Sequence, residues 1–151
     1  MKKIALYAAA AALLVGIIMV RSNTVPAGAQ SAPQKSHKVI FEVNVDGLET
    51  WQSIMNNVEN LEKALGKDNI KIELVCHGKG LNMLLTTDAP LIERMRTAKE
   101  NGVVWNACEN TMRRRNVKKE DLPAFATTVP SGVTEVVLKQ EQGWPYLKAG
   151  F

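Results

Sequence analysis

Apolar and polar side chains alternate in several short stretches of this chain, and between them apolar residues recur at helical spacing. Alternation with a period of two predicts β-strands over residues 39–45, 70–77, 103–107, 126–129 and 146–148. One face of the second strand is apolar and carries Ile70, Ile72, Leu74 and Cys76. Its other face is mixed and carries Lys71, Glu73, Val75 and His77.

Apolar residues at helical spacing and suitable end residues predict two long helices between the first three strands. The first runs over residues 48–65 and is followed by Gly66, a residue type that favours a helix C-terminus. Asp88 caps the second helix, which has Pro90 near its start and ends at Asn101-Gly102. Residues 81–85 are predicted to add a helical turn before this second helix.

Two further helices are predicted in the second half of the chain. A short one follows the third strand, with Asn106 as its N-cap, Glu109 closing a capping box and three arginines, 113–115, at its C-terminal end. Ser131 is the predicted N-cap of the last helix, which Gly143 ends. Between them, residues 118–123 are predicted to form a surface turn or short helix.

Strands and helices therefore alternate along the sequence. This order predicts an α/β fold with a mostly parallel sheet of about five strands and helices on both faces. The folded domain is expected over residues 38–151, after a polar tether at residues 30–37 that contains Pro33 and His37.

Composition and charge agree with one ordinary globular domain. The chain has 151 residues, of which 46% are hydrophobic and 23% charged. Its formal charge of +4 includes Lys2, Lys3 and Arg21, and without them 16 basic residues face 15 acidic ones. The remaining net charge of +1 gives no indication of nucleic-acid binding.

The first 29 residues have the pattern of an export signal. Lys2-Lys3 precede an apolar run from Ile4 to Val20, and Ala27-Gly28-Ala29 offers a small-residue cleavage site. We expect cleavage after Ala29 and a periplasmic location. The apolar run is long enough that an uncleaved inner-membrane anchor is the alternative, and the leader would then be the only membrane contact.

Cys108 is the principal candidate for chemistry, because it falls at the C-terminal end of a strand and the start of a helix. Backbone N–H groups at that position favour a thiolate over a thiol, while the neighbouring Glu109 opposes one. The alternative is that Cys108 packs as a small buried hydrophobe. The arginines at residues 113–115 are able to bind an anion or to form an ordinary solvated helix end.

The second cysteine raises two other interpretations. Cys76 and Cys108 both lie at C-terminal strand ends, so they are candidates for a disulfide in an exported domain, although Cys76 is expected to be a buried, inert thiol. Adding His77 gives three soft ligands, too few for a convincing metal site. The loop at His77-Gly78 is also a weak candidate for anion binding, since glycines follow a strand there.

The domain resembles the DsrE/DsrF-like family. The residues that carry the resemblance are the His77-Gly78 loop, Cys108 after the third strand, and the run Arg114-Arg115-Asn116-Val117. Ser131-Gly132-Val133 at a helix start, followed by Gly143 and Tyr146, completes the similarity.

The resemblance implies a Rossmann-like three-layer sandwich that associates into trimers or hexamers. It also implies that Cys108 accepts and passes on a persulfide between a sulfur donor and acceptor that the sequence does not identify. A sulfur carrier needs one thiolate of low pKa, so we expect no metal and no organic cofactor. Residues expected to bind near the thiol are His77, Gly78, Asn110 and Thr111. The alternative function is a non-catalytic oligomeric binding module with the same fold, in which Cys108 is structural.

Overall fold

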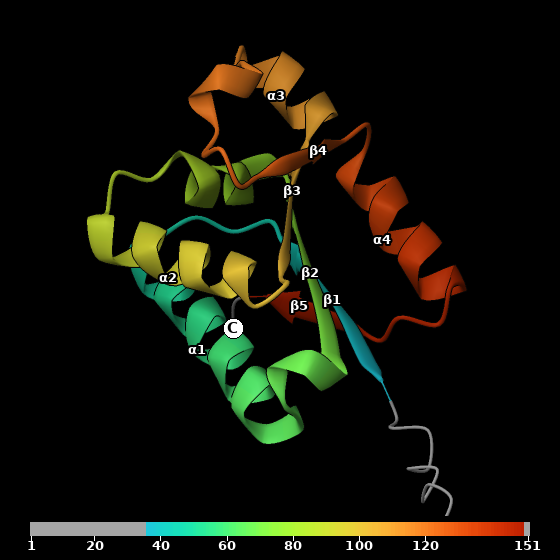
Figure 1. Cartoon of the computed structure of the whole chain (residues 1–151). Coiled ribbons are helices and arrows are strands. Elements are labelled where there is room, and N and C mark those ends of the chain that lie inside the picture. Colours follow the sequence, from blue (N-terminus) through green and yellow to red (C-terminus); the bar gives the residue numbers. More distant parts are fainter. Residues whose placement is uncertain (1–35, 150–151) are drawn as a thin grey trace, which may run out of the picture. The chain divides into compact units, whose positions relative to one another are not determined.

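The computed structural model describes residues 36–149, which are organised around a five-stranded sheet whose strands all run parallel (Figure 1). The strands are β1 (His37–Val43), β2 (Ile70–Cys76), β3 (Val104–Cys108), β4 (Thr127–Val129) and β5 (Tyr146–Ala149). Their order in the sheet is β4-β3-β2-β1-β5. The predicted α/β class and the sheet of about five strands are confirmed.

Four α-helices connect the strands: α1 (Leu48–Leu65), α2 (Ala89–Glu100), α3 (Glu109–Arg115) and α4 (Gly132–Glu141). Short 3₁₀ segments occur at η1 (Lys67–Asn69), η2 (Gly78–Leu85) and η3 (Lys119–Asp121). The chain moves in one direction across the sheet from β1 to β4 and then returns to the opposite edge for β5. Because parallel crossovers are right-handed, the return connection places α4 on the face opposite α1 and α2 (Figure 1).

The two faces of the sheet differ in chemistry. The face under α1 and α2 is apolar, with Phe41, Leu74 and Trp105 among its buried side chains. The face under α4 has a small apolar cluster, made of Ile40, Val75, Val129 and Val136 with Trp144 packed against it. Every second residue of a strand points to the same face, so Glu73, two positions before Val75, lies on the α4 face. Asn106, the β3 residue paired in register with Val75, lies there too. This face is where the candidate site is built.

Local signals predicted most element ends. The Asp88 side chain accepts a hydrogen bond from the Leu91 N–H, and that of Ser131 accepts one from the Thr134 N–H, so both predicted N-caps are confirmed. The capping box at Asn106 and Glu109 was wrong, because the ladder with β2 and β4 extends β3 through Cys108, which becomes the N-cap of α3. His37, assigned to the tether, is the first residue of β1.

The predicted signal peptide at residues 1–29 and most of the predicted tether lie outside the described residues. Within residues 36–149, none of the helices combines the length and apolar character that crossing a membrane requires.

Candidate functional site

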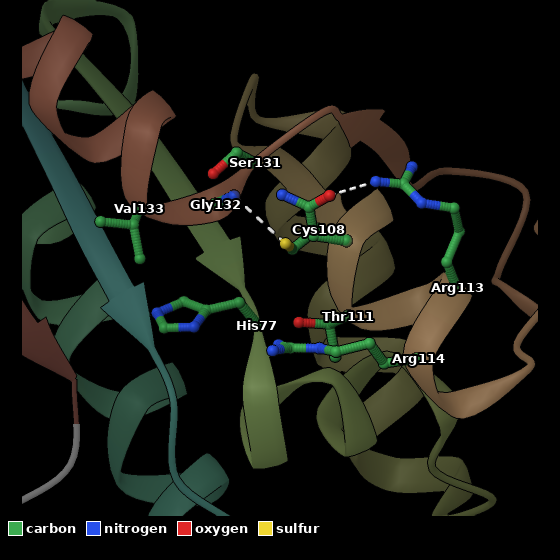
Figure 2. A pocket seen from close by; sticks show the side chains of 9 residues that line it. His77, Cys108, Thr111, Arg113, Arg114, Ser131, Gly132 and Val133 are labelled. Carbon is green, nitrogen blue, oxygen red and sulfur yellow. Dashed lines mark hydrogen bonds between the residues drawn. The ribbon is translucent and has the colours of Figure 1, made fainter.

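A pocket of about 470 Å³ opens at the carboxyl ends of β2 and β3, beside the start of α4 (Figure 2). The residues that line it are His77, Cys108, Asn110, Thr111, Arg113, Arg114, Ser131, Gly132 and Val133. Carboxyl ends of parallel strands are where α/β proteins place their ligands. Cys108 is 4% exposed, so its thiol belongs to the wall of the pocket rather than to the outer surface.

The close approach of Gly132 to the sulfur defines the site. Its backbone N–H donates to Cys108 Sγ over 3.2 Å. A β-carbon at position 132 would lie 3.0 Å from His77 Cβ, 3.1 Å from Val75 Cγ1 and 3.2 Å from Cys108 Cβ. These distances are shorter than the 3.5–4.0 Å or so of ordinary carbon contacts. Only glycine therefore lets α4 begin this close to the thiol without displacement.

Hydrogen bonds favour the thiolate of Cys108. Burial alone would raise the pKa of this thiol, because it disfavours the charged form. The N–H of Gly132, the hydroxyl and N–H of Thr111 and the N–H of Asn110 more than offset burial, so the pKa of Cys108 lies below its ordinary value. Backbone N–H groups therefore lower the pKa of Cys108 as predicted, and the largest lowering comes from Gly132 at the start of α4.

The glycine loop after β2 supports the site from behind. The N–H of Gly78 donates to Thr111 Oγ1 over 3.0 Å, which fixes the hydroxyl that in turn hydrogen-bonds Cys108. Gly80 packs so tightly on the end of β1 that an added β-carbon would lie 2.0 Å from the Val43 carbonyl oxygen. Gly78 is not among the pocket-lining residues, so the loop holds Thr111 and contributes no open anion cradle.

Charges around the pocket are arranged asymmetrically. The Glu109 carboxylate accepts a hydrogen bond from the Thr128 hydroxyl at 2.7 Å and lies outside the lining of this pocket. Arg113 and Arg114 are exposed and line it (Figure 2). Arg113 also donates a hydrogen bond to the Asn110 side chain. The lining therefore contains two arginines and no carboxylate.

His77 lines the pocket, but its imidazole extends away from the Cys108 sulfur (Figure 2). Its Nε2 lies 2.7 Å from Glu42 Oε1, and the Tyr146 hydroxyl donates to Glu42 Oε2 over 2.5 Å. Burial raises the pKa of Glu42, but the hydrogen bonds from Tyr146 and His77 outweigh it and lower that pKa. The bond to Glu42, together with burial, raises the pKa of Tyr146 to about 12. His77 is thus held by Glu42 and does not form a pair with the thiol.

Comparison with protein families shows which family the chain belongs to. The model of the DsrE/DsrF-like family matches residues 2–149. The chain belongs to this family. The resemblance inferred from the Cys108 and Ser131-Gly132 motifs is thereby confirmed, and in this DsrE/DsrF-like protein both motifs meet at one pocket. Among curated proteins, no sequence matches the chain.

Two solved structures are similar to this DsrE/DsrF-like protein. One is a protein of unknown function from Methanobacterium thermoautotrophicum, with 29% identity, a TM-score of 0.69 and coverage of 75% of this chain and 99% of that one. The other is a conserved protein of unknown function from Bacteroides thetaiotaomicron, with 15% identity, a TM-score of 0.59 and coverage of 78% and 98%. At this lower identity the similarity concerns the fold alone.

The second cysteine of this DsrE/DsrF-like protein is separated from the site. Cys76 is fully buried in the core under α1 and α2, and burial raises its pKa to about 12. It pairs in register with Ala107, so Cys108, one residue further on, points to the opposite face. Both thiols are free, and the disulfide interpretation is wrong. Nor do the described residues bring any three His, Cys, Asp or Glu side chains together as a metal site.

Several residues that shape this site have no local sequence pattern that predicts their role. Gly132 was recognised only as part of a family motif, and its contact with Cys108 spans 24 positions. Glu42 and Tyr146 are 104 positions apart, so no local pattern predicted their hydrogen bond. The one available local signal was Glu42, a half-buried carboxylate between apolar neighbours in β1, because such a group needs a hydrogen-bond partner.

Proposed function

We propose that this protein is a thiol-based sulfur carrier or transferase in which Cys108 holds a persulfide. The observation that carries the proposal is a pocket-lining sulfur that receives hydrogen bonds from Gly132, Thr111 and Asn110 and has a lowered pKa. A thiolate is the nucleophilic form of cysteine, and a lowered pKa increases its fraction at neutral pH. Family membership supports the proposal without specifying a donor or an acceptor.

The sulfur transfer requires only that one S–S bond is exchanged for another. The Cys108 thiolate attacks the outer sulfur of a donor R–S–SH, a new S–S bond forms on Cys108, and the donor's S–S bond breaks to release the thiol R–SH. The protein then holds Cys–S–S⁻, whose terminal sulfur an acceptor thiolate attacks in the second half of the cycle. The N–H and hydroxyl donors around Cys108 stabilise negative charge on sulfur in both halves, and His77 contributes to the pocket wall.

Persulfidation of the isolated protein tests this function. Incubation with an alkyl hydropersulfide is expected to add about 32 Da, one sulfur, to the peptide that contains Cys108. Cys108→Ser is expected to abolish the addition, and Cys76→Ala to leave it in place, because Cys76 lies in the opposite core. A protein whose Cys108 is alkylated readily but never retains sulfur would contradict the proposal.

The alternative is a non-catalytic binding module with the same fold. The observation in its favour is the 4% exposure of Cys108, which is low for a thiol that must meet a partner. Against it stands the lowered pKa, since a cysteine that only packs needs no set of donors around its sulfur. In the module, Cys108→Ser would leave ligand binding intact, and the wild-type protein would take up no sulfur.

We further propose that the domain works in the periplasm and as a homo-oligomer. The support for export is the sequence pattern of residues 1–29. The expected result is a protein in the periplasmic fraction whose intact mass begins at Gln30. A mass that retains residues 1–29, found in the membrane fraction, would instead establish the uncleaved anchor.

A further inference from the structure

The charge of the pocket indicates what kind of sulfur compound it receives. Two guanidinium groups, those of Arg113 and Arg114, line a pocket that contains no carboxylate, although Glu109 lies next to Cys108 in sequence. The Glu109 carboxylate is held outside by Thr128. When Cys108 is ionised, the charged side chains of the lining still carry one excess positive charge.

The arginines are available to a ligand. Both are exposed, and the Asn110 side chain takes a hydrogen bond from only one nitrogen of Arg113. A guanidinium has five N–H donors in a planar fork that matches oxyanions. The Ser131 hydroxyl lies in the same lining and adds a neutral donor. A volume of about 470 Å³ admits a small oxyanion together with hydration water.

We propose that the sulfur donor is a small sulfur oxyanion that carries a transferable sulfane sulfur, of the thiosulfate type. This inference rests on the proposed persulfide function of Cys108. A thiolate and a dianionic donor repel each other, and two arginines beside the thiol reduce that repulsion while leaving the nucleophile ionised. An uncharged donor would gain nothing from them.

The step is balanced without any further reactant. The Cys108 thiolate attacks the terminal sulfur of thiosulfate, and a bond forms between Sγ and that sulfur. The S–S bond of thiosulfate breaks, and its electron pair leaves with the SO₃ group as sulfite. The products are Cys–S–S⁻ and SO₃²⁻, so the total charge of −3 is the same before and after. Arg113 and Arg114 stabilise the charge that builds up on the leaving sulfite.

The test compares an anionic with a neutral reagent at the same sulfur. Iodoacetate and iodoacetamide both alkylate Cys108, but only iodoacetate is an anion. The ratio of their rate constants therefore measures the preference of the pocket for an anionic reagent, independently of sulfur transfer. The double variant Arg113→Gln/Arg114→Gln is expected to lower the ratio about tenfold. Arg96→Gln, on the exposed face of α2 and outside the pocket lining, is the matched control and is expected to keep the wild-type ratio.

The second arm uses thiosulfate itself with the full-length chain. Wild-type protein is expected to gain about 32 Da at Cys108 and to release one sulfite per sulfur bound, and the double arginine variant to do so about tenfold more slowly. Two results would overturn the oxyanion inference and leave the carrier function in place. One is that Cys108 accepts sulfur from an alkyl hydropersulfide but not from thiosulfate. The other is that the ratio of iodoacetate to iodoacetamide rates is the same in the double arginine variant as in the wild-type protein. If no donor loads Cys108, the proposed function itself fails.

Discussion

The reactivity of Cys108 depends on a few atoms that touch its sulfur. Gly132 approaches from α4, while Thr111 and Asn110 approach from α3, so the thiolate is held between two helices that are distant in sequence. Each N–H or hydroxyl donor exchanges a water contact for a protein contact, and bonds to a charged acceptor are the stronger ones. The loss of any donor should therefore be visible in the chemistry of the thiol.

Gly132→Ala is the sharpest test at this scale. The new methyl group would lie within about 3.2 Å of His77, Val75 and Cys108, so the start of α4 must shift outward and weaken the N–H bond to the sulfur. We expect the pKa of Cys108 to rise and alkylation by iodoacetamide at pH 7 to slow by up to about tenfold.

The measurement is the alkylation rate as a function of pH, with peptide mapping. In the wild-type protein the rate for Cys108 should rise with pH and reach half its maximum at a lower pH than for a free cysteine, since its pKa is lowered. Cys76, with a pKa of about 12 and no exposure, should react only after unfolding and so serves as internal control. An unchanged profile in Gly132→Ala would show that this N–H does not set the pKa.

Among the elements, α4 is attached to the sheet by an ion pair whose carboxylate is buried and whose lysine is partly exposed. Lys139 Nζ lies 2.5 Å from Oε2 of Glu73, a β2 residue that is 2% exposed, and 4.7 Å from the centre of the Trp144 ring. Asn106 Nδ2 donates to the other Glu73 oxygen at 2.7 Å, and Thr127 Oγ1 donates to Asn106 Oδ1 at 2.6 Å. Because Gly132 begins the same helix, this network also helps to hold its N–H on Cys108.

Lys139→Met should therefore affect both stability and chemistry. Without Lys139 the buried Glu73 carboxylate has lost the positive charge that lies beside it. We therefore expect the free energy of unfolding to fall by about 3 kcal/mol. Cys108 should also alkylate more slowly at pH 7 in the folded protein. Urea unfolding and the alkylation rate are the two measurements.

Two further variants distinguish the loss of the ion pair from the general effect of replacing a lysine with methionine. Adding Glu73→Gln to Lys139→Met removes the uncompensated charge and should restore most of the lost stability. Lys63→Met, at an exposed position in the last turn of α1, should change the free energy of unfolding by less than about 0.5 kcal/mol. Equal losses for Lys139→Met and Lys63→Met would show that the Glu73–Lys139 pair stabilises nothing.

Elements that depend on interactions between residues close in sequence were predicted, and those that depend on contacts between distant residues were not. The helices and their caps at Asp88 and Ser131 depend on residues within one turn, and the sequence predicted them correctly. Asn106 was predicted as a cap because its local context suits one, but Glu73 and Thr127 bind it in the sheet and override that preference. The thiol was found from the strand–helix junction. The residues of α4 that contact Cys108 are brought there by the order of the strands in the sheet, and the spacing of residues along the sequence does not predict that order.

The whole domain leaves part of its α4 side uncovered. Val133 is 58% exposed, Val137 46% and Leu138 44%, all on α4. Tyr146 on the edge strand β5 pairs in register with Ile40, so it is a further exposed side chain on this face. Val133 and Val137 are four residues apart and share one stripe of the helix. Val133 also lines the Cys108 pocket, so an interface on this stripe would border the thiol.

We expect this stripe to pack against a second copy of the chain, in agreement with the proposed homo-oligomer. Val137→Glu places a charge in the stripe without altering the pocket lining, so it should convert the oligomer to monomer while the free energy of unfolding of the monomer changes little. Leu48→Glu makes the same chemical change at an exposed residue at the start of α1 and should leave the assembly intact. Light scattering coupled to gel filtration measures the mass of each variant. A wild-type protein that is monomeric at micromolar concentration would rule out self-association, and an oligomer that survives Val137→Glu would place its interface elsewhere.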